Sequence, residues 1–428
     1  MSAAPPPPFE ASAAYSRYVL GVLFLVAVFA LVDRQIFGML IEPIKREFEV
    51  SDTWLGLASG LSFALFYAIA GLPIARWADR GVRRSIIALG LFAWSALTLA
   101  SGLVSSFGQL VVARLAIGVG EAAGTPPSHA LLSDYFPPAR RAGALSVYTA
   151  GASLGVFLAY LAGGWIQELW GWRAVFLCLG APGMALALLV RLSVREPPRG
   201  RFDATAPRAV ATRAALGHLL GLPSYRHLLA AFSLHALAFT GASMWNPAFL
   251  ARIHGMQAGE IGTMLAFGSA ACMGLGILAA GRAIDRLAAR DLRWTLWGPG
   301  LASLATVPFT LAFLFAPTRA LALLCLAPAA LLTGFGTPGM HAATQELARP
   351  STRATAAALN LLVLTLVGAG LGPTLVGATN DALSPVFGAE AIRWSLALAA
   401  ATAAWSGAHA LLAARSFPAD REAAARDA

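Results

Sequence analysis

Long apolar tracts alternate with short charged segments along most of this chain. From residue 18 to residue 414 the charged side chains gather in short connections, and tracts of about 20 mostly apolar residues lie between them. A helix of that length crosses the hydrocarbon core of a bilayer once. The pattern predicts about twelve helical spans, at residues 17–41, 53–75, 85–105, 109–132, 142–165, 174–193, 227–250, 259–283, 294–315, 320–346, 354–378 and 394–414.

A polar stretch at 194–226 separates the sixth span from the seventh. It divides the chain into one bundle of six helices at 17–193 and a second at 227–414, with 194–226 as a cytoplasmic linker. The Pro-rich start, 1–16, and the end, 415–428, have the composition of disordered cytoplasmic tails. We therefore expect an all-α membrane protein whose twelve transmembrane helices form two six-helix halves.

The composition excludes several classes of protein. Hydrophobic residues make up 58% of the 428 positions and charged residues only 12%, about half the share in a soluble domain. Lys45 is the single lysine, and its neighbours do not form a Walker A motif, so ATP hydrolysis by a P-loop is excluded. The three cysteines lie in apolar tracts without metal-ligand spacing. We expect neither a metal nor a cofactor.

The basic residues indicate how the chain is oriented. The net charge is +10, and 23 basic residues fall in connections on the side of both termini, against 6 on the other side. Positive charge gathers on the cytoplasmic side of membrane proteins. Both termini are therefore expected in the cytoplasm of a multi-pass inner-membrane protein, and the basic charge indicates a lipid bilayer rather than a nucleic acid as partner.

Two motifs recur at similar offsets in the two halves. Asp79-Arg80 after the second span returns as Asp285-Arg286 after the eighth, 206 positions later, and His129 in the fourth span returns as His341, 212 positions later. These offsets indicate duplication of a six-span unit. Transporters with parallel repeats bind their substrate near the bilayer midplane, between the halves.

Four charged residues lie inside the predicted spans. Asp33 and Arg34 follow about fifteen apolar residues, which places them ~24 Å into a ~30 Å hydrocarbon core. Arg114 and Glu121 are seven positions apart and so share one helix face, with Glu121 near the middle of the bilayer. Charges at such depth cost ~2.5–3.5 kcal/mol each and usually face a partner or a cavity. We predict that the four form one network.

This network has the chemistry of proton coupling. An Arg partner favours the ionised form of a buried carboxylate, and its departure favours the protonated form. We expect Glu121 to be the proton-binding group, with Asp33 the second candidate. Arg34 and Arg114 are then charge partners, or ligands for an anionic headgroup. A static network of ion pairs is the structural alternative.

Span 227–250 carries the candidates for the opposite wall of a substrate cavity. They are the polar or aromatic residues Thr240, Trp245, Asn246 and His235. Asn and Trp also serve in helix packing. A histidine titrates near neutral pH in its unperturbed state, and a packing role is the structural alternative for His235.

The charged residues after the second span resemble a family motif. Asp79, Arg80, Arg83 and Arg84 are similar to the loop motif of the major facilitator superfamily, and Arg114 with the glycine four positions later resembles its fourth-span motif. The resemblance implies the fold of that superfamily and a cytoplasmic gate at the motif. Further gate residues are then the possible partners and the second-half repeat: Asp134, Glu196, Asp285 and Arg286.

Within the superfamily, the chain resembles the spinster group of lysolipid and sphingolipid transporters. The segments that carry this resemblance are 33–36, 118–122, 133–138, 163–165, 171–173 and 195–200. The resemblance implies secondary active transport of a lysophospholipid or sphingoid substrate by alternating access, with protons as the coupled ion and a monomer as the working unit.

Three alternatives remain open. A proton-driven exporter of drugs or metabolites would use the same fold, whereas a passive lipid scramblase or channel would give flux that needs no gradient and does not saturate. His129 and Asp134 also fit the short His-x4-Asp pattern of glycerolipid acyltransferases, but no other enzymatic motif accompanies it. We therefore expect a transporter and not an enzyme.

Overall fold

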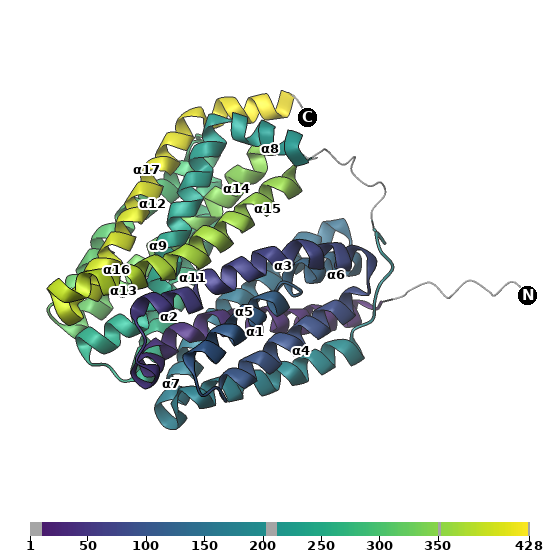
Figure 1. The fold of residues 1–428 in the computed structure, drawn as a ribbon. Helices are drawn as coiled ribbons and strands as arrows, with labels where there is room; N and C mark the ends of the chain where they lie inside the picture. Colours follow the sequence, from purple (N-terminus) through teal and green to yellow (C-terminus); the bar gives the residue numbers. More distant parts are fainter. Residues whose placement is uncertain (1–10, 203–211, 350–351, 427–428) are drawn as a thin grey trace, which may run out of the picture.

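The computed structural model describes residues 11–202, 212–349 and 352–426. The predicted tail 1–16, linker 194–226 and tail 415–428 therefore lie partly outside the described residues. The first half is helical from residue 13 to residue 193 (Figure 1). Its helices are α1 (Ala13–Phe48), α2 (Asp52–Ser59), α3 (Leu61–Arg80), α4 (Arg83–Ser101), α5 (Phe107–Glu121), α6 (Thr125–Tyr135) and α7 (Pro138–Ser193).

The second half repeats this arrangement after a short helix, α8 (Thr212–Gly221), which lies in the predicted linker. Two of its spans include π-helical segments. Its elements are α9 (Pro223–His254), α10 (Ala258–Leu265), η1 (Ala266–Ala271), α11 (Cys272–Ala288), α12 (Trp294–Phe315), α13 (Arg319–Phe335), α14 (Thr337–Leu347), α15 (Arg353–Val363), η2 (Leu364–Leu371), α16 (Gly372–Phe387), η3 (Gly388–Glu390) and α17 (Ala391–Arg426).

These elements make twelve membrane spans, as the hydrophobic pattern predicts. Ten continuous helical segments among the described residues are long and apolar enough to cross a bilayer, and two of them, with 56 and 70 residues, are long enough to cross twice. The 56-residue helix α7 turns back at Gly171, whose φ of 83° is a conformation that favours glycine. The 70-residue segment turns at Gly388, with a φ of 55°.

Breaks within spans fall at equivalent places in the two halves. α5 ends at Glu121 and α6 begins at Thr125, while α13 ends at Phe335 and α14 begins at Thr337. Each new helix carries a proline in its first turn, where the missing N–H costs nothing. The offset of 212 between the two Thr-Pro pairs therefore reflects one structural unit used twice.

The halves meet at one end and diverge at the other. Contacts between α2 and α16, between α7 and α10 and between α1 and α9 join them at the end that carries residues 42–56 and 252–262. We call this the outer end, because the charge pattern places those connections outside. At the inner end, α3 and α6 lie apart from α14 and α15 (Figure 1).

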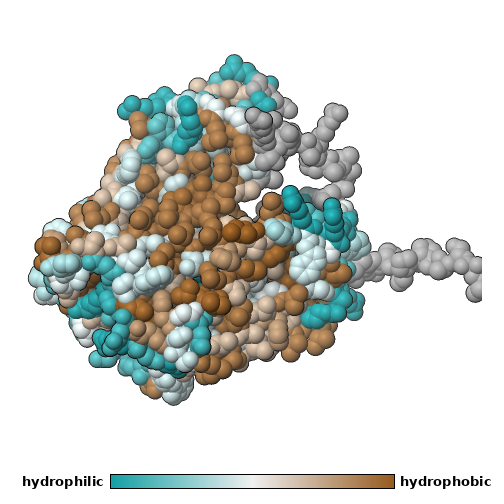
Figure 2. All heavy atoms as spheres, in the orientation of Figure 1, coloured by the Kyte–Doolittle hydropathy of each residue, from teal (hydrophilic) through white to brown (hydrophobic). Residues whose placement is uncertain are grey.

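The surface agrees with a membrane protein. Figure 2 shows apolar side chains across the middle of both halves and hydrophilic side chains toward the two ends. Large apolar residues are exposed on the surface; Leu192 is 79% exposed and Leu324 71%. Such exposure would be costly in water and is favourable against lipid.

The two predicted tails are partly helical, and this corrects the expectation of disorder. α1 begins at Ala13, where the hydroxyl of Ser12 accepts a hydrogen bond from Tyr15 N. At the other end α17 continues to Arg426, and Phe417 on it is fully buried. The polar composition of 415–428 concealed an amphipathic helical extension that packs against the second half.

Candidate functional site

The four charged residues inside the spans come together in the first half. Asp33 and Arg34 are neighbours on α1, and Arg114 and Glu121 lie on α5. Asp33, Arg114 and Glu121 are 4%, 1% and 2% exposed. The structure therefore brings together the four charged residues that their depths along the predicted spans place in one network.

Arg34 and Glu121 form the closest pair. Arg34 Nε donates to Glu121 Oε2 at 2.5 Å. The Arg34 guanidinium also lies 4.7 Å from the ring centre of Tyr67 and 5.0 Å from that of Phe63, a cation–π arrangement. The Glu121 side chain is fully buried, whereas 28% of the Arg34 side chain is exposed. Arg34 is thus the more accessible member of the pair.

Asp33 and Arg114 form a looser pair. Arg114 Nη1 lies 3.9 Å from Asp33 Oδ1 and 3.4 Å from the backbone oxygen of Asp33. The hydroxyl of Thr98 donates to Asp33 Oδ1 at 2.9 Å. The Arg114 guanidinium lies 5.3 Å from the ring centre of Phe37. Aromatic faces therefore replace water around both guanidinium groups.

Each carboxyl keeps one oxygen that no protein donor serves. Among the described residues, Asp33 Oδ2 and Glu121 Oε1 are buried and have no hydrogen-bond partner. The two carboxyl groups are close enough to interact with each other. Buried polar groups are nearly always satisfied, so two carboxyl oxygens without a partner in one cluster set this site apart from an ordinary packed core.

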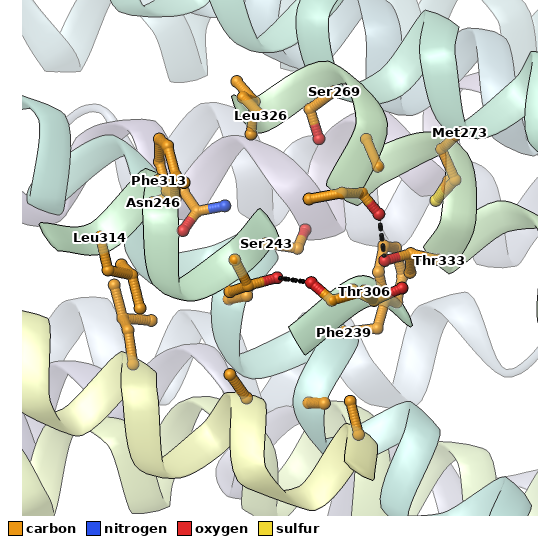
Figure 3. Close-up of a pocket in the computed structure, with 18 of the residues that line it drawn as sticks. Phe239, Ser243, Asn246, Ser269, Met273, Thr306, Phe313, Leu314, Leu326 and Thr333 are labelled. Atoms are coloured by element: carbon orange, nitrogen blue, oxygen red, sulfur yellow. Dashed lines mark hydrogen bonds between the residues drawn. The ribbon is translucent and has the colours of Figure 1, made fainter. Parts of the chain in front are cut away.

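The candidates in the seventh span divide into two groups. His235 and Asn246 line a cavity of about 90 Å³ in the second half, between α9, η1, α11, α12, α13 and α17 (Figure 3). Thr240 and Trp245 do not line this cavity. Thr240 Oγ1 donates to Gly368 O at 2.5 Å, and Trp245 Nε1 donates to Pro373 O at 2.9 Å. These two residues hold α9 against the eleventh span.

Hydroxyl groups in the cavity wall were not predicted. Three of them donate within their own helix: Thr306 to Ala302 O, Thr310 to Thr306 O and Thr333 to Ala329 O. They lie among apolar side chains of the wall, and the hydroxyl residues are Ser243, Ser269, Ser303, Thr306, Thr310 and Thr333 (Figure 3). In alanine-rich helices the sequence alone does not indicate which Ser or Thr faces inward.

A polar contact between the halves was also missed. Gln35 Nε2 donates to Ser243 O at 3.0 Å and to Tyr160 Oη at 2.9 Å, and Ser243 Oγ donates to Gln35 Oε1 at 3.0 Å. Gln35 follows Asp33 and Arg34 on α1. The charged network is therefore one residue away from the contact that joins α1 and α9.

The predicted inner-gate residues form a buried cluster within the first half. Arg83, 3% exposed, donates to Asp134 and, at 2.7 Å, to Glu196 Oε1. Glu196 Oε2 also accepts from Arg84 N at 2.9 Å. The two acidic partners expected from the sequence thus contact Arg83, and they connect α4, α6 and the segment after α7.

The other inner-gate candidates are accessible. Asp79 and Arg80 are exposed at the end of α3, and Asp285 and Arg286 are exposed at the end of α11. Arg199 donates to the backbone oxygen of Asp79 and so holds the end of α3. With the inner ends apart, the Asp-Arg pairs of the two halves face open space.

Comparison with known proteins identifies the family. The sequence profile described as Major Facilitator Superfamily matches residues 23–373. The chain belongs to the major facilitator superfamily. Members of this superfamily are membrane transporters, so the chain is a secondary transporter and a multi-pass membrane protein. Among the described residues, no group of three or more His, Cys, Asp or Glu side chains could hold a metal ion.

Two curated relatives are informative. An MFS-type efflux pump of Mycolicibacterium smegmatis is 37% identical over 382 residues, which cover 89% of this chain and 88% of the pump. Protein spinster homolog 1 of Bos taurus is 27% identical over 435 residues, which cover 93% of this chain and 80% of that protein.

A solved structure agrees with the second relative. A bacterial homolog of the human lysosomal transporter spinster, in an inward-facing and unoccupied conformation, superposes with a TM-score of 0.88 at 29% identity. The match covers 96% of this chain and 99% of that one. The resemblance to the spinster group is therefore confirmed.

Proposed function

We propose that this transporter moves a lipid-like amphipath of the lysophospholipid or sphingoid type, coupled to protons, by alternating access. The membrane is the bacterial inner membrane, with both termini in the cytoplasm and the monomer as the working unit. The observation that carries proton coupling is the buried network of Asp33, Arg34, Arg114 and Glu121, in which each carboxyl has an unserved oxygen.

The network links proton binding to the position of Arg34. Two guanidinium groups balance two carboxylates when Glu121 is ionised. If Arg34 turns to an anionic headgroup between the halves, Glu121 loses its partner while fully buried. An unpaired carboxylate in an apolar setting favours its protonated form. A proton held by Glu121, and shared with the free oxygen of Asp33, restores neutrality.

The proposed substrate class rests on two supports. The spinster resemblance covers nearly the whole chain. In addition, the guanidinium of Arg34 is the kind of group that contacts a phosphate, while the cavity wall in the second half combines apolar side chains with His235 and Asn246. An amphipath needs a charged contact and an apolar one, and the two halves offer one each.

Export of drugs is the second candidate. The 37% identity to a mycobacterial efflux pump over 88% of that pump favours it. Organic cations would bind to the carboxylates of Asp33 and Glu121 rather than to the arginines, because charge of opposite sign attracts. The charge of the transported molecule therefore separates the two candidates.

For the inner ends we propose a gate of the repeated Asp-Arg pairs. Asp79 and Arg80 in one half and Asp285 and Arg286 in the other are exposed where the halves lie apart. Closure of the inner end would bring opposite charges of the two halves together. The buried Arg83 cluster with Asp134 and Glu196 would hold the first-half part of this gate in shape.

The test is uptake of labelled lysophosphatidylcholine by proteoliposomes, with and without an imposed pH gradient. We compare the wild type with Glu121→Gln and with a matched control, Glu47→Gln. Glu47 pairs with Arg173 Nη1 at 2.6 Å on the outer surface, away from the network. Saturable uptake stimulated by the gradient is expected for the wild type and the control, and Glu121→Gln should lose the stimulation.

Other outcomes decide between the alternatives. Transport of ethidium but not of lysophosphatidylcholine would replace the lipid substrate with a cationic drug. Flux that neither saturates nor responds to the gradient would contradict carrier function and indicate a passive pathway. Full stimulation in Glu121→Gln would remove the coupling role from that residue.

A further inference from the structure

The outer seam between the halves is one helix pairing used twice. α2 of the first half packs on α16 of the second, and α10 of the second half packs on α7 of the first. A Cβ added at Gly377 would lie 2.3 Å from Asp52 O, and one added at Gly164 would lie 2.5 Å from Ala258 O. Positions 52 and 258 differ by 206, the offset of the repeated Asp-Arg pairs, and positions 164 and 377 differ by 213. The two contacts are therefore equivalent under the repeat.

Each pairing contains a helix cap supplied by the other half. In the first, Asp381 on α16 accepts from the first turn of α2. Asp52 N donates to its Oδ1 at 3.1 Å, and Thr53 N and Thr53 Oγ1 donate to its Oδ2 at 2.7 and 2.5 Å. The first N–H groups of a helix have no partner within that helix, so Asp381 satisfies two of them.

The second cap is the counterpart of the first. Glu168 on α7 accepts from Gly259 N, in the first turn of α10, at 2.7 Å. The N-cap residue of α10, Gln257, provides no side-chain cap of its own. A Cβ at Gly259 would lie 2.9 Å from Glu168 Oε2 and 2.9 Å from the Trp165 ring, so glycine favours the close approach. Positions 168 and 381 differ by 213, and positions 53 and 259 by 206.

We propose that Asp381 and Glu168 are the outer gate of the transporter: each caps, across the seam, the second-span helix of the opposite half. The N-terminus of a helix carries partial positive charge, which a carboxylate complements. Both caps exist only while the outer ends are together. Opening the outer end separates each carboxylate from its helix, so the pair sets the balance between the closed and open outer states.

Water next to the caps makes this gate reversible. A cavity of about 430 Å³ reaches Asp381, and one of about 690 Å³ reaches Glu168. When the caps separate, water from these cavities serves the freed N–H groups and carboxylates. The gate therefore stabilises the closed outer state only by the difference in free energy between a cap hydrogen bond and a hydrogen bond to water. Because this difference is small, the transporter can alternate between the closed and open states.

Arg252 adds a tie that the repeat does not share. Its Nη1 and Nη2 donate to the two oxygens of Asp52 at 2.5 and 2.9 Å, and its Nε donates to Glu42 at 2.6 Å. The position equivalent to Asp52 is Ala258, which has no carboxylate. The two caps are thus the symmetric part of the gate, and Arg252 strengthens only the first.

The experiment measures the outer opening by distances between spin labels. The labels are placed on exposed outer residues, Leu103→Cys and Ala320→Cys, in a background where Cys178, Cys272 and Cys325 are replaced by alanine. A second pair at the inner end, on the exposed Ala139 and Ala289, reports the opposite side. Asp381→Ala, Glu168→Ala and the double variant are compared with Glu47→Gln, which breaks an outer ion pair inside one half.

Each alanine variant should raise the ratio of open to closed outer states about fivefold, the factor that a typical helix cap contributes. The double variant should raise it about 25-fold, because the caps are separate. Asp381→Asn and Glu168→Gln keep one acceptor oxygen and should shift the ratio less in the same direction. The inner pair should move toward shorter distances in parallel, and Glu47→Gln should change neither pair.

Unchanged outer distances in both alanine variants of folded, monodisperse protein would overturn the proposal. So would an equal shift in Glu47→Gln, because the effect would then belong to surface charge in general. The measurement uses no substrate, so failure of lysolipid transport in liposomes would refute the proposed function and leave the gate intact.

Discussion

Arg34 Nε lies 2.5 Å from Glu121 Oε2, and this bond joins α1 to α5 across 87 positions of sequence. The pair is unequal: the Glu121 side chain is fully buried, whereas 28% of the Arg34 side chain is exposed. Under the proposed function, a ligand that draws Arg34 away leaves Glu121 buried without its charge partner. In the proposed mechanism, this asymmetry makes substrate binding at Arg34 the event that leads to proton uptake by Glu121.

Removing the arginine alone should destabilise the protein. Arg34→Ala leaves Glu121 buried without its partner and should lower the unfolding free energy by about 2 kcal/mol, at the low end for a buried pair because 28% of Arg34 is exposed. Thermal unfolding in detergent measures the change. Adding Glu121→Gln removes the unpaired charge, so the double variant should recover part of the loss.

The double-mutant cycle supplies the control for this prediction. If Arg34 and Glu121 acted independently, the two losses would add. Additive losses would contradict a coupled pair and favour a packing role for Arg34 over the rings of Phe63 and Tyr67.

Much of the fold and of the charged network can be predicted from the sequence, because a bilayer permits few structures for a chain with this hydrophobic pattern. Span length, the side on which arginines gather, and the 206 and 212 offsets predicted twelve spans and two halves. Depth along two helices was enough to place Asp33 beside Arg114 and Glu121 near Arg34, since both pairs must avoid lipid. Charged side chains inside a membrane must pair with each other or face a cavity, so their positions in the sequence indicate which helix faces meet.

Other features needed the structure. Thr240 and Trp245 face the eleventh span and not the cavity. The sequence did not predict this, because in an alanine-rich helix the hydrophobic pattern does not distinguish a lipid face from a packing face. Asp381 and Glu168 lie in unremarkable polar segments, and their roles depend on backbone N–H groups 329 and 91 positions away. The local sequence does not indicate which helix N-terminus a distant carboxylate will cap.

The buried cluster at the inner end should be the most sensitive charged site outside the network. Arg83→Ala leaves the carboxylates of Asp134 and Glu196 without their charge partner. It also removes the donors to Ala130 O and Pro197 O. We expect a loss of about 3 kcal/mol in unfolding free energy, the scale for breaking a buried pair from one side. Arg80→Ala, an exposed neighbour in the same motif, should change the unfolding temperature little.

Thermal unfolding of the two variants side by side gives the measurement. Equal effects of Arg83→Ala and Arg80→Ala would contradict the cluster as a structural element. The result would then indicate that the positive charge of the motif matters and not its buried contacts.

Added bulk in the outer seam should open the outer end by steric clash, in the same direction as loss of a cap. A Cβ at Gly262 would lie 2.3 Å from Tyr160 O and 3.0 Å from Gly164 Cα. Gly262→Ala should therefore keep the outer ends apart. A cysteine placed at Ala248, which is 1% exposed, should react with an impermeant maleimide faster in this variant. Gly274→Ala, where a Cβ meets nothing within 4 Å, is the control and should not change the rate.

The C-terminal extension should contribute to stability, because it caps and covers the start of the second half. Ser224 N donates to Asp420 Oδ2 at 2.9 Å, and Arg421 Nε pairs with Glu346 at 2.8 Å. Asp420→Ala should lower the unfolding free energy by about 1 kcal/mol, the usual contribution of a helix cap. Phe417→Ala should cost about 3–5 kcal/mol, because that ring is fully buried.

Thermal unfolding separates these effects from a disordered tail. Glu422→Ala, on the exposed side of the same extension, is the control and should leave the unfolding temperature unchanged. A disordered segment would respond to none of the three substitutions, because no side chain in it would have a fixed partner. An unfolding temperature that stays constant in Phe417→Ala would therefore show that the extension does not pack on the bundle in detergent.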